Sequence, residues 1–200
     1  MSRALRVALT FDAEHPDRAT QPGSTAAVVS ILAERGVRAT FFLQGRWVEA
    51  YPQLAREVAK RGHLVGNHSF YHARMPLLSP SGLATDIRAA ERAIVAATGV
   101  DPRPWFRCPF GAGTDDPRVR AGIARLGYRE IHWDVDGADW RPSMRGRGMA
   151  RQMTRDAVAR GDGAILLLHP WTMATGLGLA PLIDGLHVAG ATFVRMDALG

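Results

Sequence analysis

The amino-acid sequence predicts an α/β fold in which seven strands close, or nearly close, into a barrel. Short β-like apolar runs alternate along the chain with amphipathic stretches of helical period. This alternation is typical of parallel strands joined by right-handed helical crossovers. An open doubly wound sheet is the competing topology. No linker or change of composition divides the 200 residues, so we expect a single domain spanning residues 1–200.

The expected elements follow one another in a regular order. Strands are expected at 6–12, 37–43, 63–67, 104–108, 128–135, 163–169 and 191–196. Helices are expected at about 24–36, 52–62, 80–99, 117–126, 148–160 and 180–188. Ser79 suits an N-cap and Pro80 the first helical turn, which predicts where the third helix begins.

Composition excludes several classes of protein. A hydrophobic content of 46% argues against disorder, and no apolar run is long enough to span a bilayer. The N-terminal run lacks the separate apolar core and cleavage site of a signal peptide, so we expect a cytoplasmic protein, or a secreted one if an export segment has been removed. Cys108 is the single cysteine, so an internal disulfide is excluded. We expect Cys108 to be a small buried residue rather than a nucleophile.

The net charge of +6 does not indicate a nucleic-acid or membrane partner. All but one of the 25 basic residues are arginine, and they are interleaved with acidic residues apart from the short "RGRG" at 145–148. No basic stripe with interleaved aromatic residues is present, so nucleic-acid binding is not expected. The sequence predicts no particular oligomeric state.

Most of the unusual polar residues fall at or just after the ends of expected strands. In chain order they are Asp12, Glu14, His68, His72, Arg107, Asp136, Asp139 and His169. Active sites of α/β barrels are built at the carboxyl ends of the strands. The sequence therefore predicts an active site at this rim.

Two histidines there have a spacing typical of metal ligands. His68 and His72 lie four residues apart in "HSFYH", and on a helical turn both imidazoles would face the same side. Two surface histidines would give the same pattern. A catalytic metal also needs a third ligand, for which a carboxylate on a neighbouring strand end is the expected source.

His169 follows a very apolar strand and is either a satisfied core histidine or a general acid or base. Asp136 or Asp139 would orient it and raise its pKa, unless both belong to a polar loop. Arg107 would pair with Asp12 and keep it ionised, unless it is a surface arginine before a turn.

Taken together, five segments resemble the motifs of the polysaccharide deacetylases, the NodB-homology group or carbohydrate esterase family 4. They are "TFDAE", "HSFYH", "RCPFG", "DGADW" and "LLLH", in the family's order, across about residues 5–197. The resemblance implies a distorted (β/α)7 barrel. It also implies a metal-dependent hydrolase that removes N-acetyl groups from an amino sugar, an oligosaccharide or a related acetamide.

The resemblance also implies roles for individual residues. The metal, usually zinc with cobalt, nickel or manganese as alternatives, would be bound by His68 and His72. Asp12 would be the general base and His169 the acid that protonates the leaving amine. The backbone N–H of Phe110 would help to polarise the substrate carbonyl. Asp139 would support His169, and Arg107 would support Asp12. The substrate groove would be lined by Trp140, Pro109 and Leu167.

The sequence departs from the family pattern at Ala13, where the first motif usually has a metal-binding aspartate. Glu14 is the expected replacement, because alternate residues of an extended chain share a face and Glu14 then points the same way as Asp12. His15 is the rival ligand, and a weak or absent metal site is the third alternative. The corresponding alternative functions are hydrolysis of another small-molecule C–N bond, as in the allantoinase-like branch, and sugar binding without catalysis.

Overall fold

The computed structural model describes residues 5–15 and 24–199, so both ends of the predicted domain of residues 1–200 lie outside the described residues. The strands are β1 Leu5–Ala13, β2 Thr40–Leu43, β3 Leu64–Asn67, β4 Trp105–Phe106, β5 Arg129–Glu130, β6 Val135–Asp136, β7 Ala164–Leu168 and β8 Ala191–Phe193. The α-helices are α1 Ser24–Glu34, α2 Gly45–Ala50, α3 Pro52–Lys60, α4 Pro80–Thr98, α5 Pro117–Arg125, α6 Gly146–Arg160 and α7 Met173–Val188. Short 3-10 turns are η1 Met75–Leu77, η2 Pro109–Gly111 and η3 Met196–Ala198.

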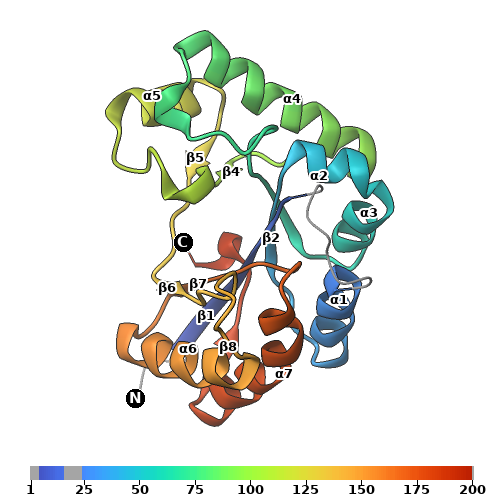
Figure 1. The fold of residues 1–200 in the computed structure, drawn as a ribbon, viewed down its shortest axis with the longest axis vertical. Helices are drawn as coiled ribbons and strands as arrows, with labels where there is room; N and C mark the ends of the chain where they lie inside the picture. The colour runs from blue at the N-terminus through green and yellow to red at the C-terminus, as the bar shows by residue number, and fades with distance from the viewer. Residues whose placement is uncertain (1–4, 16–23, 200) are drawn as a thin grey trace.

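All strands belong to one parallel sheet that curls into a barrel. Their order is β5-β4-β3-β2-β1-β7-β6, and β8 pairs with the first residues of β1. Neighbouring helices contact one another in the order α6, α7, α1, α3, α4, α5, so they form a single layer around the outside of the sheet (Figure 1). A doubly wound sheet would instead carry helices on both faces. The predicted barrel class is therefore confirmed.

The barrel is open between β5 and β6. These strands are the two ends of the order, and no ladder joins them within the described ranges. Sequence analysis expected one strand at 128–135, and this expectation was wrong. The chain pairs first with β4 and then with β7, because Ile131 N donates to Phe106 O and Asp134 N donates to Ile165 O. Residues 131–134 therefore cross the opening instead of continuing one ladder.

Alternation along β1 decides which side chains enter the barrel. Val7, Leu9 and Phe11 belong to the main core between sheet and helices. Ala8 belongs instead to a smaller cluster with Phe42, Trp105, Ile131 and Met196. Because alternate residues of a strand share a face, Thr10 and Asp12 lie on the side of Ala8 and face the interior of the barrel.

Helix boundaries follow their capping residues. Ser79 accepts a hydrogen bond from Gly82 N at the start of α4, as the sequence indicates. The last helix was expected from residue 180 but begins at Met173, where Thr172 accepts a hydrogen bond from Thr175 N. None of the helices in the described part of the chain combines the length and apolarity that a membrane span requires.

Candidate active site

The site begins at the end of β1, where a buried ion pair lies inside the barrel. The guanidinium of Arg107 is fully buried and donates hydrogen bonds to Asp12 Oδ1 at 2.9 Å and Thr10 Oγ1 at 2.8 Å. It also donates to the carbonyl oxygens of Ile131 and His132. This network fixes the Asp12 carboxylate in one orientation and supplies its compensating charge.

A second group of side chains gathers beside Asp12. Nitrogen or oxygen atoms of Glu14, His68 and His72 all lie within 4.8 Å of one another. Glu14 Oε2 lies 3.3 Å from His68 Nε2 and contacts His72 Nε2. Asp12 Oδ2 lies 3.5 Å from the same atom of His68. One carboxylate and two imidazoles thus converge at the rim of the barrel, next to a second carboxylate.

The loop that carries the two histidines is not helical, contrary to the geometry assumed from their spacing. Ser69 and His72 both have left-handed backbone, with φ of 63° and 59°. Asp86 on α4 accepts hydrogen bonds from two backbone N–H groups of the loop, and Ser69 Oγ accepts one from His72 N. These bends bring the imidazole of His72 within 5.0 Å of that of His68, centroid to centroid.

The side chains of this cluster fit a divalent metal. His68 Nδ1 lies 2.9 Å from the carbonyl oxygen of Arg107, so Nδ1 carries the proton and Nε2 presents a lone pair to the cluster. His72 Nε2 is buried and has no hydrogen-bond partner among the described residues, although it contacts the Glu14 carboxylate. Two imidazole nitrogens and one carboxylate oxygen are the donor set of many catalytic zinc sites.

The electrostatics of Glu14 and His72 agree with this fit. Burial acts to raise the pKa of Glu14, but the three imidazoles around its carboxylate, of His15, His68 and His72, outweigh burial and hold that pKa well below its usual value. Burial lowers the pKa of His72. Burial also acts to lower the pKa of His68, but the charges of Asp12 and Glu14 outweigh burial there and raise that pKa. A deprotonated carboxylate and a neutral imidazole are the states that metal ligands require.

His15, the rival ligand considered from the sequence, occupies a different position. Its Nε2 lies 2.8 Å from Glu14 Oε1, whereas Glu14 Oε2 is the oxygen nearest to His68 and His72. Its left-handed backbone, with φ of 59°, turns the side chain back toward Glu14, and Gln44 Oε1 accepts a hydrogen bond from its backbone N–H. Sequence reasoning missed Gln44, although its place directly after β2 puts it on the same rim.

Opposite the cluster lies a buried histidine–aspartate pair. His169 Nδ1 lies 2.7 Å from Asp139 Oδ1. Asp139 Oδ2 accepts hydrogen bonds from His169 N, Thr172 Oγ1 and Thr175 Oγ1. Asp136, the other aspartate considered from the sequence, accepts a hydrogen bond within its own turn instead. Asp139 is therefore the residue that orients His169.

This pair gives His169 a strong preference for its charged form. Burial acts to lower the pKa of His169, but the charge and hydrogen bond of Asp139 outweigh it and raise that pKa to about 9. The other ring nitrogen, Nε2, faces the cluster of Glu14, His68 and His72 and lies 3.8 Å from Glu14 Oε1. A proton donor and a candidate metal centre thus face each other across the rim.

The residues expected to form a substrate groove are placed unequally. Trp140 is half-exposed beside Asp139, and both line a hollow of about 510 Å³. Other residues that line it, which the sequence did not single out for this role, are Arg141, Pro142, Met144, Met173 and Leu177. Pro109 and Leu167 are buried, whereas Phe110 is exposed with left-handed backbone and its ring lies 4.4 Å from that of His72.

Known proteins resemble this chain along most of its length. A family model described as polysaccharide deacetylase matches residues 2–131. A chitooligosaccharide deacetylase from Bradyrhizobium sp. (strain ANU 289) is 35% identical over 170 residues, which cover 84% of this chain and 72% of that protein. A peptidoglycan-N-acetylmuramic acid deacetylase from Bacillus subtilis (strain 168) is 30% identical over 193 residues, covering 96% and 70%.

Solved structures resemble the fold as well. A mutant of a pseudoenzyme of carbohydrate esterase family 4 from Bacillus anthracis superimposes with a TM-score of 0.87 at 29% identity. That match covers 99% of this chain and 67% of the other.

Proposed function

The chain belongs to the polysaccharide deacetylase family, and from this premise we propose that it is a metal-dependent hydrolase of N-acetyl groups on an amino sugar or oligosaccharide. One observation carries the proposal. Three potential metal ligands, Glu14, His68 and His72, lie together and face the charged imidazole of His169. His169 Nε2 lies 3.8 Å from Glu14 Oε1. Metal-assisted amide hydrolysis uses two units, a metal centre that activates water and a proton donor for the leaving amine.

The first unit would bind the metal and activate water. Glu14, His68 and His72 would hold the ion, for which zinc is proposed on the basis of the nitrogen and oxygen donors. When bound, a divalent metal polarises a carbonyl group and lowers the pKa of water. Asp12, held by Arg107 at 2.9 Å, would accept the proton that the attacking water loses.

The second unit would release the product. An amine is a poor leaving group until it is protonated, and His169 would supply that proton from Nε2. Asp139, 2.7 Å from Nδ1, keeps the imidazole charged at neutral pH. The backbone N–H of Phe110 would stabilise negative charge on the substrate oxygen in the transition state.

An N-acetylated carbohydrate is the proposed substrate class. The relatives from Bradyrhizobium and Bacillus subtilis are named for chitooligosaccharide and peptidoglycan-N-acetylmuramic acid. Trp140 beside the hollow offers this chain an aromatic surface on which a sugar ring can pack.

The proposal is tested by measuring bound metal and acetate release in parallel. The metal-free protein is reconstituted with zinc, cobalt, nickel or manganese and then incubated with N-acetylglucosamine oligomers. We expect the wild type to bind metal and to release acetate. We expect Glu14→Ala to lose both, while Glu57→Ala, which removes an exposed carboxylate paired with Arg61, retains both.

Two outcomes would contradict the proposal in different ways. Full metal affinity in Glu14→Ala would show that Glu14 is not a ligand. A metal-loaded wild type that binds sugars without releasing acetate would favour hydrolysis of another C–N bond or sugar binding alone. Ala13 in place of the usual aspartate, and the likeness to a pseudoenzyme, favour sugar binding without catalysis as the second candidate.

A further inference from the structure

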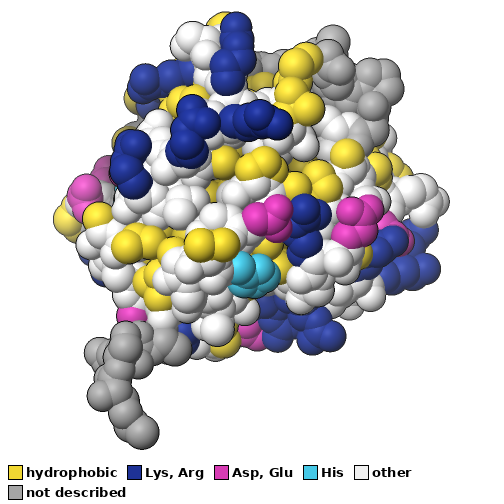
Figure 2. Space-filling model, turned by 90° about the horizontal axis from the view of Figure 1, so that it is seen from below, with side chains coloured by type: hydrophobic (Ala, Val, Ile, Leu, Met, Phe, Trp, Pro, Cys, Tyr) yellow, Lys and Arg dark blue, Asp and Glu magenta, His cyan; other side chains and the backbone are white. Residues whose placement is uncertain are grey.

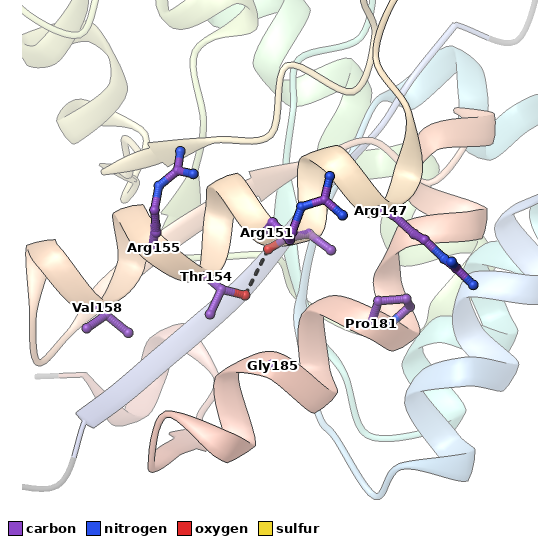
Figure 3. Close-up of a pocket in the computed structure, with 8 residues that line it drawn as sticks. Arg147, Arg151, Thr154, Arg155, Val158, Pro181 and Gly185 are labelled. Atoms are coloured by element: carbon purple, nitrogen blue, oxygen red, sulfur yellow. Dashed lines mark hydrogen bonds between the residues drawn. The ribbon is translucent and has the colours of Figure 1, made fainter.

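We propose that the groove between α6 and α7 docks an acidic, amphipathic helix of a partner protein. The groove is a hollow of about 670 Å³ on the outside of the barrel, away from the residues given roles in hydrolysis. Its apolar or small lining residues are Ala150 and Val158 on α6 and Pro181 and Gly185 on α7 (Figure 3).

A row of three arginines borders this groove. Arg147, Arg151 and Arg155 follow one another at intervals of four residues on α6, so they rise by roughly 6 Å per step along the helix axis. In Figure 3 the side chains of Arg151 and Arg155 extend in the same direction, and that of Arg147 extends past Pro181. None of the three has an ion pair or hydrogen bond to another side chain or backbone group in the described ranges. Two other arginines of the chain differ, because the half-buried Arg35 pairs with Asp184 and the exposed Arg160 pairs with Asp134.

An exposed apolar stripe runs along the neighbouring helix. Pro181 is exposed on α7 and lines the groove, whereas Met173 and Leu177 are exposed on the two preceding turns and line the hollow beside Trp140. Val158 on α6 is also exposed, on the opposite side of the groove. In the view from below, basic side chains gather next to hydrophobic ones on the same face of the molecule (Figure 2). An apolar patch with a polar rim is the usual form of a protein-interaction site.

These features together select one kind of partner. A partner helix with an acidic residue at every fourth position presents carboxylates at the same spacing as the three arginines. Apolar residues on the adjoining face of that partner helix can pack against the apolar lining of the groove. Sites that bind single-stranded nucleic acids or glycans usually provide aromatic side chains for stacking, and the groove has no aromatic residue among its lining residues. A second copy of this chain, with a net charge of +6, would bring like charge to the arginine row.

The test uses a defined probe. The probe is a fluorescent helical peptide of roughly 18 residues, about five turns, with glutamates every four positions and leucines along the adjoining edge. We expect saturable binding to the wild type that weakens as salt is added, measured by fluorescence anisotropy. The combined change Arg147→Glu, Arg151→Glu and Arg155→Glu should weaken binding by at least about tenfold, and Val158→Asp should weaken it as well.

The matched control is the combined change Arg88→Glu, Arg92→Glu and Arg125→Glu. These arginines are also exposed and border another hollow, but that hollow lies between α4 and α5. We expect this control to bind the probe as the wild type does. Circular dichroism verifies that each variant folds, and replacement by glutamine is the substitute for any glutamate variant that does not.

Four results would overturn the proposal. A peptide of the same composition in scrambled order binds equally well, or the control variant loses as much affinity as the α6 variant. Vesicles of anionic phospholipid bind the wild type while the peptide does not, which would indicate a membrane surface. Finally, analytical ultracentrifugation detects a dimer that the α6 variant abolishes, which would indicate a second copy of the chain.

Discussion

Arg107 links β1, an interior strand of the sheet, to the segment that crosses the opening of the barrel. It donates to Thr10 and Asp12 on β1 and to the carbonyl oxygens of Ile131 and His132, which lie in the segment that crosses the opening. The same guanidinium therefore holds the candidate general base and supports the part of the sheet that lacks a ladder. A residue of the proposed active site is at the same time a structural element of the fold.

Replacing Arg107 should strongly destabilise the protein. In Arg107→Met the Asp12 carboxylate loses its buried partner, so we expect a loss of about 3–5 kcal/mol in the free energy of unfolding, measured with urea. Arg103→Met removes an exposed arginine that pairs with Asp101 and should cost less than about 1 kcal/mol. Equal urea midpoints for the two variants would show that the buried pair does not stabilise the fold.

Asp139 should set the pH at which His169 loses its proton. Because the negative charge of Asp139 favours the imidazolium, Asp139→Asn should lower the pKa of His169 from about 9, by roughly 2 units. Any hydrolytic activity should then decline at a lower alkaline pH. NMR titration of the imidazole in the metal-free protein measures the shift directly, with Asp136→Asn as the control. An unchanged titration in Asp139→Asn would refute the role of Asp139.

His15 should support the metal site without being one of its ligands. Its Nε2 lies 2.8 Å from Glu14 Oε1, so it holds the carboxylate with the other oxygen toward His68 and His72. We expect His15→Ala to weaken zinc affinity about 10-fold to 100-fold in calorimetric titrations. His15→Gln should recover part of the loss, because an amide can also donate to Glu14. An effect no larger than that of the exposed His187→Ala would contradict this role.

At the scale of the elements, two glycines allow α6 and α7 to approach closely. A methyl group on Gly146 would lie 2.7 Å from the backbone nitrogen of Gly178, and one on Gly178 would lie 2.5 Å from Gly146 O. Gly148 and Gly176 lie on the same two helices, but a methyl group on either would have no neighbour within 4 Å. Replacing glycine by alanine should therefore lower the free energy of unfolding at Gly146 and Gly178 but not at Gly148 and Gly176.

Thermal and urea unfolding test this contrast. Gly146→Ala or Gly178→Ala should destabilise by about 1–3 kcal/mol, because the two backbones must separate. Gly148→Ala or Gly176→Ala should be neutral or stabilise by up to about 1 kcal/mol, since alanine is the better helix former. The proposed contact is refuted if all four variants unfold alike.

The packing of α6 on α7 also explains why the start of α7 was predicted wrongly from the sequence. Gly176, Gly178 and Pro181 resemble signals for a break, so the pattern placed the start of α7 near residue 180 rather than at Met173. Packing against α6 overrides those signals, and Gly178 serves the close approach. By contrast, the start of α4 was predictable, because Ser79 and Pro80 form a strong local signal.

At the scale of the whole molecule, the candidate site joins residues that lie far apart in the chain. Asp12, His68, Arg107 and His169 were foreseeable as neighbours, because parallel strands bring their carboxyl ends to one rim. Strand alternation predicted that Glu14 rather than His15 points the same way as Asp12. The contact of His15 with Glu14 was not foreseeable, since it depends on the left-handed backbone of His15, which no sequence period signals. The loop of His68 and His72 misled for the same reason, because a spacing of four also fits a helix.

The stability of the whole fold should depend on the protonation of His63, a buried histidine outside the site. Its Nδ1 accepts a hydrogen bond from Ala39 N at 3.1 Å, an arrangement that requires the neutral ring. Burial, together with the charges of Arg61, Arg38 and Arg195, lowers its pKa to about 4. Between this value and the unfolded value near 6.5, the unfolded chain binds the proton that the folded chain excludes.

Stability should therefore fall as the pH decreases from about 6.5 to about 4, by up to about 3 kcal/mol from this residue. In His63→Asn the amide oxygen can accept the same hydrogen bond from Ala39 without titrating, so this part of the pH dependence should disappear. Urea unfolding across that pH range measures it as the difference between the wild-type and variant curves, which removes the shared contribution of the carboxylates. The control His187→Gln changes an exposed histidine and should follow the wild-type curve. Parallel curves for the wild type and His63→Asn would refute the assignment. A protein with a buried neutral histidine must lose stability as its unfolded chain gains a proton, and the variant lacks that histidine.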